Sequence, residues 1–376
     1  MIQCDLDQFT IVWKNESSFE GLGFEDYCQY FISHITSEMK MIDYLGVPQR
    51  SGGRNGYDRV FTLGENTWIG YNSNRDDMGI CFYFSSRGLE SYIGSYNANE
   101  EEDLTRYKVI QNICSVVNDR YITLDGDIIE FNGYWSLSRC DIAIDFIDEL
   151  SSEEFDSFSK KVSENEIELR KISYKGNEVS SRTQEIKLIL TKAGVQTLYI
   201  GQRTSPVFVR FYDKKKQLED VGQTFEEASK IETYFRFEVE IKMKGKEERA
   251  EILNQICLLD SSDSFVSWCI QVATDKYRFY ESGKLCRISE LMLSNLDKNN
   301  LKAVLKQTKM LEYEYEKSKH YFKEGDSGLQ GLFYKIRMIE GEEKFLEFVQ
   351  ELVKFQREKY IPSEKVKIYL NGKEKK

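Results

Sequence analysis

The chain has 376 residues, of which 13% are aromatic and 31% charged, and it contains only 3 prolines. This composition is typical of a folded protein of two or three domains and excludes a disordered chain. The formal net charge of −11 argues against coating nucleic acid through bulk positive charge, although a local basic surface stays compatible with it because salt screens charges over about 10 Å.

The first predicted elements are short strands and two helices. A strand covers residues 8–13, and apolar residues at helical spacing between Phe24 and Ile35 predict a helix over about 24–40. Gly52, Gly53 and Gly56 predict turns, since no helix start or Lys-Ser/Thr pair follows them as a phosphate-binding loop requires. A strand at 79–84 is broken at 85–88, and a helix follows at about 100–118.

The middle of the chain is rich in predicted strands. A hairpin over 121–133 turns at an Asp-Gly pair, and the strand 136–146 leads into a helix capped by Ser151 or Ser152. The remaining strands are expected at 187–190, 197–201, 207–212 and 234–243. They do not alternate regularly with helices, as a parallel sheet requires, so we expect an antiparallel sheet.

From about residue 246 the pattern becomes helical. Helices are expected in the segments "KEERAEILNQICLL", "SDSFVSWCIQVATDKYRFY", "NLKAVLKQTKMLEYEYEK" and "EEKFLEFVQELVKFQREKY". The sequence therefore predicts an α+β fold class. Residues 1–245 form a domain with a curved antiparallel sheet and helices packed on one face, and residues 246–376 form a mostly helical domain. The two halves of the first domain share a loose strand–helix–strand rhythm without an exact repeat.

Several classes of site and location are excluded by residue usage. The eight cysteines include no C-x-x-C pair and lie mostly in apolar periodic stretches, so we expect reduced core thiols. Only two histidines exist, far apart, which argues against a zinc site or a His-centred triad; a catalytic metal would depend on carboxylates. No apolar run approaches the roughly 20 residues of a membrane span, and the N-terminus lacks signal-peptide features, so we expect a cytoplasmic protein without a membrane partner.

Acidic residues occupy one face of two predicted strands. In "RCDIAIDF" the alternation of a strand places Asp141 and Asp145 on one face and apolar residues on the other. In "RFEVEIK" it does the same with Glu238 and Glu240. One interpretation is a sheet with one solvated, charge-paired side. The alternative is a divalent metal site, because Asp is a poor strand former and its presence twice in one short strand needs a reason.

The spacing of these carboxylates limits which of them can share an ion. Two residues along a strand are about 6.6 Å apart, so Glu238 and Glu240 can converge on one cation. Asp141 and Asp145 are about 13 Å apart, so we expect one to be a ligand and the other to pair with an arginine.

The segment "TLYIGQRTSPVFVRFYDKKKQL" predicts a hairpin whose second strand carries Arg210 and Tyr212 on one face. A tyrosine in a sheet usually anchors it through its ring. One beside an arginine, lysines and a bound divalent ion could instead attack a phosphodiester, since nearby positive charge favours loss of the phenol proton. The candidates for contacts with DNA phosphates are Arg203, Arg210, Lys214, Lys215 and Lys216.

Three strings in this order resemble the replication initiation factor (Rep_trans) family, which comprises rolling-circle plasmid initiators and related nickases of integrative conjugative elements. They are "SLSRCDIAIDF", the hairpin segment above, and "IETYFRFEVEIK", and the resemblance covers about 134–243. It implies a metal-dependent enzyme that nicks and religates one strand at a DNA origin through a covalent 5′-phosphotyrosine. Tyr212 matches the family's "R-x-Y-[DEN]-K" string and is the implied nucleophile, with Arg210 beside it; Tyr199 is the runner-up.

The resemblance also implies partners and a cofactor. The cofactor is a divalent cation, Mg²⁺ or Mn²⁺, held by members of the set Asp141, Asp145, Glu238 and Glu240. The implied partners are origin DNA, a helicase, the host DNA polymerase and a second copy of the chain in a homodimer. Recognition of duplex DNA is expected from the C-terminal helices, because a helix fits the major groove.

Three other functions are compatible with the same residues. A conjugative-element relaxase would use the same chemistry on a different DNA. A non-catalytic DNA-binding replication or regulatory protein would not need the Tyr212 hydroxyl. A metal nuclease would use the carboxylates and water without a covalent intermediate.

Overall fold

The fold is described from a computed structural model. It describes residues 1–16, 23–64, 66–116, 120–122, 128–173, 176–181, 185–192, 194–220, 231–296 and 328–359. The chain forms two compact units, Met1–Asp297 and Lys298–Lys376. Among the described residues, no helix is both long and apolar enough to cross a membrane.

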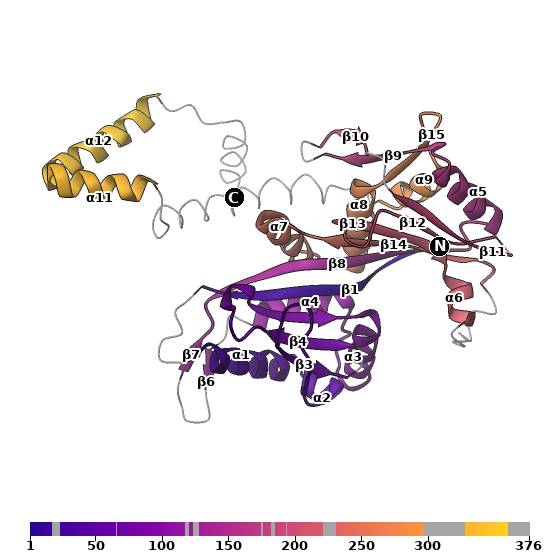
Figure 1. Ribbon diagram of the computed structural model, residues 1–376, viewed down its shortest axis with the longest axis horizontal. Coiled ribbons are helices and arrows are strands. Elements are labelled where there is room, and N and C mark those ends of the chain that lie inside the picture. Colours follow the sequence, from indigo (N-terminus) through magenta and orange to yellow (C-terminus); the bar gives the residue numbers. More distant parts are fainter. Residues whose placement is uncertain are drawn as a thin grey trace. The chain divides into compact units, whose positions relative to one another are not determined.

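The first unit is built on an antiparallel sheet of ten strands (Figure 1). In spatial order they are β11 (Ile186–Thr191), β12 (Gly194–Ile200), β13 (Val207–Asp213), β14 (Tyr234–Lys242), β8 (Gly133–Ile147), β1 (Ile2–Asn15), β5 (Ile80–Phe84), β4 (Thr67–Tyr71), β3 (Arg59–Leu63) and β2 (Gln49–Ser51). The two long strands β1 and β8 run side by side through the middle of the sheet, paired from Ile2↔Phe146 to Asn15↔Gly133.

The strand order repeats on the two sides of this central pair. On one side β1 is followed by α1 (Phe24–Glu38) and by four strands, the last of which, β5, pairs with β1. On the other side β8 is followed by α5 (Ser152–Ser163), and the last strand of its set, β14, pairs with β8. The strand–helix–strand pattern seen in both halves of the sequence thus corresponds to two halves of one sheet that have the same connectivity.

One face of the sheet is apolar, and helices cover it. In the first half Trp13 of β1 stacks on Phe31 of α1, with ring centroids 5.0 Å apart. In the second half Phe155 of α5 meets Phe211 of β13 edge to face at 4.9 Å. The Ser151 side chain accepts a hydrogen bond from the Glu154 backbone and forms a capping box, which fixes the start of α5 after the strand. The predicted fold class, an antiparallel sheet with packed helices, is confirmed.

Differences from the expectation include a helix after Ser85 and a hairpin at 278–285. Ser85 does not simply end a strand: its side chain accepts a hydrogen bond from the Gly88 backbone and begins α3 (Ser86–Asn99), a helix that the sequence analysis missed. The helix expected to continue to Tyr280 is α8 (Ser262–Lys276), which ends earlier. The residues after α8 form a hairpin of β15 (Arg278–Glu281) and β16 (Lys284–Leu285). Ser282 and Gly283, between the two strands, both adopt positive φ, which is the geometry of a tight hairpin turn.

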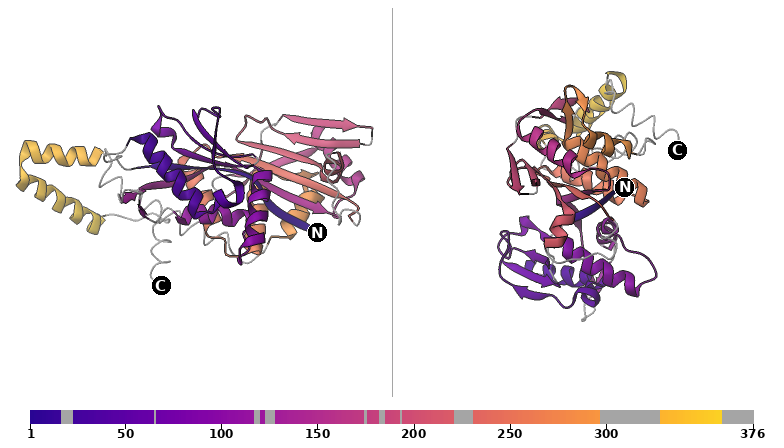
Figure 2. Two further views of the ribbon diagram at one scale, coloured as in Figure 1. Left: turned by 90° about the horizontal axis from the view of Figure 1, so that it is seen from below. Right: turned by 90° about the vertical axis from the view of Figure 1, so that its right-hand side faces the viewer.

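The helices described between residues 246 and 294 belong to the first unit. α7 (Lys246–Cys257) packs against β8, and α8 packs against β1, β8 and β9 (Ile167–Ile172). Much of α8 is buried, including Trp268 and Ile270. The predicted boundary at 245 therefore falls inside Met1–Asp297, because α7, α8 and α9 (Arg287–Ser294) complete the core around the sheet (Figure 2).

The described part of the second unit is a pair of helices, α11 (Gly328–Glu340) and α12 (Glu342–Lys359). Gly341, with φ +93°, separates them. Phe333 of α11 contacts Phe345 and Phe348 of α12, with ring centroids 5.4 and 6.2 Å apart. The helix expected in "NLKAVLKQTKMLEYEYEK" lies outside the described residues.

Candidate active site

The second face of the sheet gathers charged side chains from β8, β14 and β13. The register places Glu240 opposite Asp141 and Arg236 opposite Asp145. It also places Arg210 opposite Glu238 and Tyr212 opposite Arg236. The structure therefore brings the four predicted carboxylates onto one surface with Arg210 and Tyr212. Since these strands are far apart in sequence, only their pairing creates the site.

Each carboxylate of this surface is buried and paired with a cation. Asp141 and Glu238 are each 1% exposed, and a charge so buried requires a partner. Glu238 forms an ion pair with Arg210. Asp141 accepts two hydrogen bonds from Arg139, at 2.8 and 2.6 Å. These ion pairs explain how several carboxylates can be buried on one face of the sheet.

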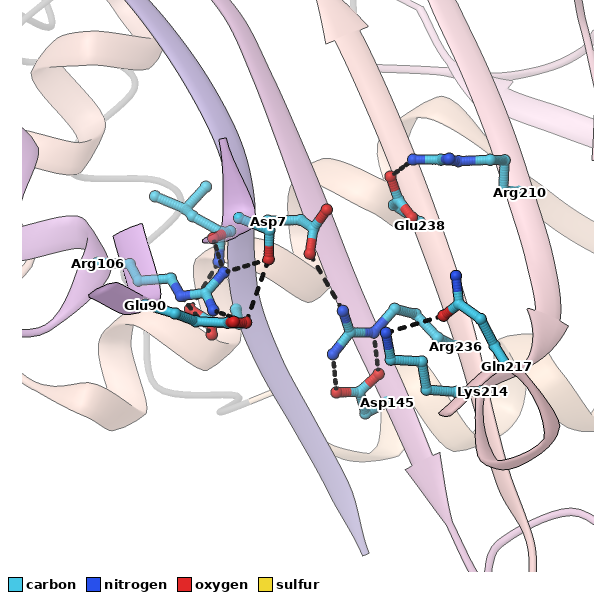
Figure 3. A network of polar contacts seen from close by, with 12 residues as sticks. Asp7, Glu90, Arg106, Asp145, Arg210, Lys214, Gln217, Arg236 and Glu238 are labelled. Carbon is cyan, nitrogen blue, oxygen red and sulfur yellow. Dashed lines mark hydrogen bonds and ion pairs between the residues drawn. The ribbon is translucent and has the colours of Figure 1, made fainter. Parts of the chain in front are cut away.

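Asp145 belongs to a second network around Arg236 (Figure 3). The Arg236 guanidinium donates to the two carboxylate oxygens of Asp145 at 2.7 and 2.8 Å and to Asp7 at 3.1 Å. The Tyr234 hydroxyl also donates to Asp145, at 2.9 Å. Both aspartates thus pair with an arginine, Asp141 with Arg139 and Asp145 with Arg236, so these pairs do not distinguish a metal ligand between them. The Arg236 network lies beside Tyr212, which is opposite Arg236 in the register.

Tyr212 is half-buried at the end of β13, and its hydroxyl faces a carboxylate. The hydroxyl donates to Glu238 Oε2 at 3.5 Å, whereas Glu238 Oε1 pairs with Arg210. The Lys214 ammonium lies 5.9 Å from the centroid of the Tyr212 ring. Burial and the charge of Glu238 raise the pKa of Tyr212 above its ordinary value, so the resting phenol is protonated. A nucleophilic role would require transfer of this proton, and Glu238 is the neighbouring acceptor.

Burial also favours the protonated form of two carboxyl groups, Glu238 and Asp141. Burial raises the pKa of Glu238 to about 7, although the adjacent Arg210 lowers it. Burial likewise raises the pKa of Asp141 to about 6 against the lowering effect of Arg139. Groups whose pKa lies near neutrality in a polar site are typical of general acid–base chemistry, although ion-pair networks of structural role produce the same shifts.

Asp7 is a site residue that the sequence analysis missed. It is the extra residue of a β-bulge in β1, between Leu6 and Gln8, and the bulge lets its side chain reach Arg236 across β8. Its charge raises the pKa of both Tyr212 and Glu238. A signal existed, since Asp at residues 5 and 7 is unusual in a strand.

Two carboxylates of this surface, Asp141 and Glu240, are the candidates for holding a divalent cation. Asp141 and Glu240 share the Arg139 guanidinium, which lies 2.6 and 2.9 Å from their carboxylate oxygens, so these oxygens already converge on one positive group. Hard oxygen donors suit Mg²⁺ or Mn²⁺, and Mg²⁺ commonly uses only one or two carboxylates in addition to substrate phosphate. Among the described residues, no group of three or more His, Cys, Asp or Glu side chains is arranged to hold a metal.

The predicted phosphate-binding cations do not all lie beside Tyr212. Lys214 lies beside Tyr212 at the start of α6 (Lys214–Asp220), where Asp213 caps the helix by accepting from the Lys216 backbone at 2.9 Å. Lys215 donates to the backbone carbonyls of Ile231 and Glu232 at 2.7 and 3.3 Å. The Lys216 ammonium donates to Thr191 at 3.4 Å, and Arg203 lies in the turn at the opposite end of β13 from Tyr212. Arg210, the fifth candidate, pairs with Glu238.

The runner-up tyrosine, Tyr199, lies on β12 opposite Arg210. Its ring stacks on Phe208, with centroids 5.7 Å apart and an interplanar angle of 12°. This packing is typical of a tyrosine that stabilises a sheet, whereas the Tyr212 hydroxyl faces an acid.

Comparison with known proteins identifies the family. The sequence model of the family described as "Replication initiation factor" matches residues 135–353, which is more than half of the chain. The chain belongs to the replication initiation factor family. The resemblance seen in the three strings is thus confirmed, and Asp141, Asp145, Tyr212, Glu238 and Glu240 all lie inside the matched region.

A solved structure is also similar to this replication initiation factor. It is described as the rolling circle replication initiator protein from Geobacillus stearothermophilus. The two sequences are 14% identical; the alignment covers 78% of this chain and 97% of that chain, with a TM-score of 0.47. The search of curated proteins gives no match.

Proposed function

We propose that this replication initiation factor nicks and religates one DNA strand at an origin of rolling-circle replication, with Tyr212 as the nucleophile. The observation that carries the proposal is the placement of a half-buried tyrosine hydroxyl 3.5 Å from a carboxylate oxygen, beside Arg210 and Lys214. Membership of the family supports a role in replication initiation.

In the proposed reaction the Tyr212 oxygen attacks a backbone phosphorus. The bond between phosphorus and the 3′-oxygen breaks, the phenol proton passes to Glu238, and the leaving 3′-oxygen takes up a proton to become a 3′-OH. The 5′-phosphate stays attached to Tyr212 as a phosphodiester. Attack by the 3′-OH on this phosphotyrosine reverses the step and reseals the strand.

The surrounding residues have separate roles in this proposal. Arg210 and Lys214 would stabilise the negative charge that develops on the phosphate. Asp145, Arg236 and Asp7 would hold the surface beside Tyr212 in position. Asp141 and Glu240 would hold Mg²⁺ or Mn²⁺ when Arg139 moves aside, and the bound cation would polarise the scissile phosphate.

Partners follow from the proposed product. The free 3′-OH would be the primer for a DNA polymerase, and strand displacement would need a helicase. Recognition of duplex origin DNA by the C-terminal helices and homodimer formation stay predictions. A relaxase of an integrative conjugative element would use the same site, and the two functions differ only in the DNA that is cut.

The test is covalent capture of DNA. The full chain is incubated with Mg²⁺ or Mn²⁺ and a pool of single-stranded oligonucleotides drawn from the DNA around its gene, and adducts are mapped by mass spectrometry. We expect an adduct on Tyr212 that is lost in Tyr212→Phe and kept in Tyr199→Phe, the matched control. Cleavage without any adduct would support a metal nuclease instead, and DNA binding without cleavage would support a non-catalytic protein.

A further inference from the structure

Two cysteines meet where α4 (Arg106–Val116) packs against α7. Cys114 lies in the last turn of α4 and is half-buried, and Cys257 is the last residue of α7 and is exposed. Cys257 raises the pKa of Cys114, as expected for two neighbouring thiols. One turn before Cys114, the Gln111 side chain donates to the carbonyls of Ile256 and Leu259 at 2.9 and 2.8 Å. These bonds fix the end of α7 against α4 and keep the two thiols together.

This pair differs from the other thiols of the chain. All eight cysteines lie in described residues, and Cys257 is the exposed one among them. Burial raises the pKa of Cys140 and of Cys269 above the ordinary value, as expected for inert core thiols. Reaction with a dissolved oxidant requires access, so Cys257 is the thiol that such a molecule can reach.

We propose that Cys257 and Cys114 form a redox-reactive dithiol that exchanges with small-molecule disulfides and closes reversibly into a disulfide between α4 and α7. This inference does not depend on the proposed nicking reaction, because neither cysteine belongs to the charged surface around Tyr212.

The exchange is balanced with a disulfide such as oxidised glutathione. The Cys257 thiolate attacks one sulfur of glutathione disulfide, which forms a mixed disulfide and releases one glutathione thiolate that takes up the proton from Cys257. Cys114 then attacks the Cys257 sulfur, the mixed disulfide breaks, and the second glutathione leaves with the proton of Cys114. Two electrons pass from the protein thiols to glutathione disulfide.

The two cysteines have different roles in this sequence. The neighbouring Cys257 thiol, followed by burial, raises the pKa of Cys114 above its ordinary value. Cys114 therefore stays a thiol at rest and acts second, as the resolving residue. Cys257, exposed at the helix end, acts first.

Closure would affect stability because of where the two helices lie. α4 contacts α1 and β1 in the first half of the sheet, and α7 contacts β8 and follows β14 of the second half. A bond between residues 114 and 257 closes a long loop of chain and restricts the unfolded state. We expect the melting temperature of the oxidised protein to exceed that of the reduced protein by several degrees.

The experiment uses the full chain treated with oxidised glutathione, followed by alkylation, non-reducing digestion and mass spectrometry. We expect a peptide pair linked through Cys114 and Cys257 that dithiothreitol separates. Cys114→Ser should accumulate glutathione on Cys257, because the resolving thiol is missing, and Cys257→Ser should show neither product. Cys286→Ser, a change at a buried cysteine, is the control and should keep the linked pair.

Three results would overturn the proposal. One is a wild-type chain in which both thiols stay free while glutathione reacts elsewhere. Another is a disulfide that joins other cysteines. The third is a Cys114→Ser variant that retains no glutathione on Cys257. Circular dichroism of each variant checks that it is folded, so none of these results is attributable to unfolding.

Discussion

Replacing Arg236 by Met tests whether the pairing of β8 with β14 has the register described above. The Arg236 side chain is 13% exposed and pairs with Asp145 and Asp7, so its removal leaves two carboxylates without their guanidinium. Removing one partner of a buried ion pair costs about 3–5 kcal/mol. We therefore expect Arg236→Met to lower the free energy of unfolding by about this amount.

Chemical denaturation followed by circular dichroism measures the effect, and a double-mutant cycle assigns it. In Arg236→Met/Asp145→Asn both charges are absent, so the double variant should be more stable than the sum of the single changes predicts, with a coupling energy of about 1–3 kcal/mol. Arg75→Met is the control, because its ion pair with Asp77 is exposed and should contribute nothing measurable. The register would be refuted if Arg236→Met were no more destabilising than Arg75→Met, or if the cycle showed no coupling.

Three further predictions concern the reaction and the packing of the sheet. Glu238→Gln keeps the shape of the side chain but removes its basicity, and it should slow adduct formation by about 10²–10⁴-fold in single-turnover assays while oligonucleotide binding, measured by anisotropy, stays the same. Asp141→Asn should raise the Mn²⁺ concentration needed for half-maximal nicking; an unchanged requirement would place the cation elsewhere. Gly79 has φ +71°, and an added Cβ would lie 2.2 Å from the Trp13 carbonyl oxygen, so Gly79→Ala should destabilise the chain by more than about 1 kcal/mol in urea unfolding, whereas the helical Gly94→Ala, with open space around it, should not destabilise it.

The charged face could be predicted because it follows from local alternation. In β8 and β14 the charged residues occupy alternate positions, so Glu238 and Phe237 had to point to opposite faces of the strand whatever the rest of the fold. The sequence could not show which strands are neighbours. The pairing of Glu238 with Arg210 and of Asp141 with Glu240 depends on contacts between residues far apart in the chain.

The elements that escaped prediction depend on features without a local pattern. Asp7 reaches the site only because a bulge shifts β1 against β8, and a period of two residues gives no sign of a bulge. α7 and α8 have the periodicity of helices in either domain, so periodicity did not reveal that they pack on the sheet. That assignment depends on the burial of Trp268 and Ile270 in α8 and on the contacts of α8 with β1, β8 and β9.

The repeated connectivity of the sheet explains why one half of it is the better candidate for chemistry. The face that carries the charged residues in the second half continues into the first half, because Thr10 of β1 lies opposite both Arg139 of β8 and Tyr83 of β5. In the second half this face carries Tyr212 and its charged partners. In the first half it carries a buried apolar cluster of Val12, Val60, Trp68 and Cys81 with Tyr57 and Tyr83 packed against it. An apolar surface offers neither a proton acceptor for a phenol nor positive charge for a phosphate, so the proposed strand transfer would take place in the half that contains β13 and β14.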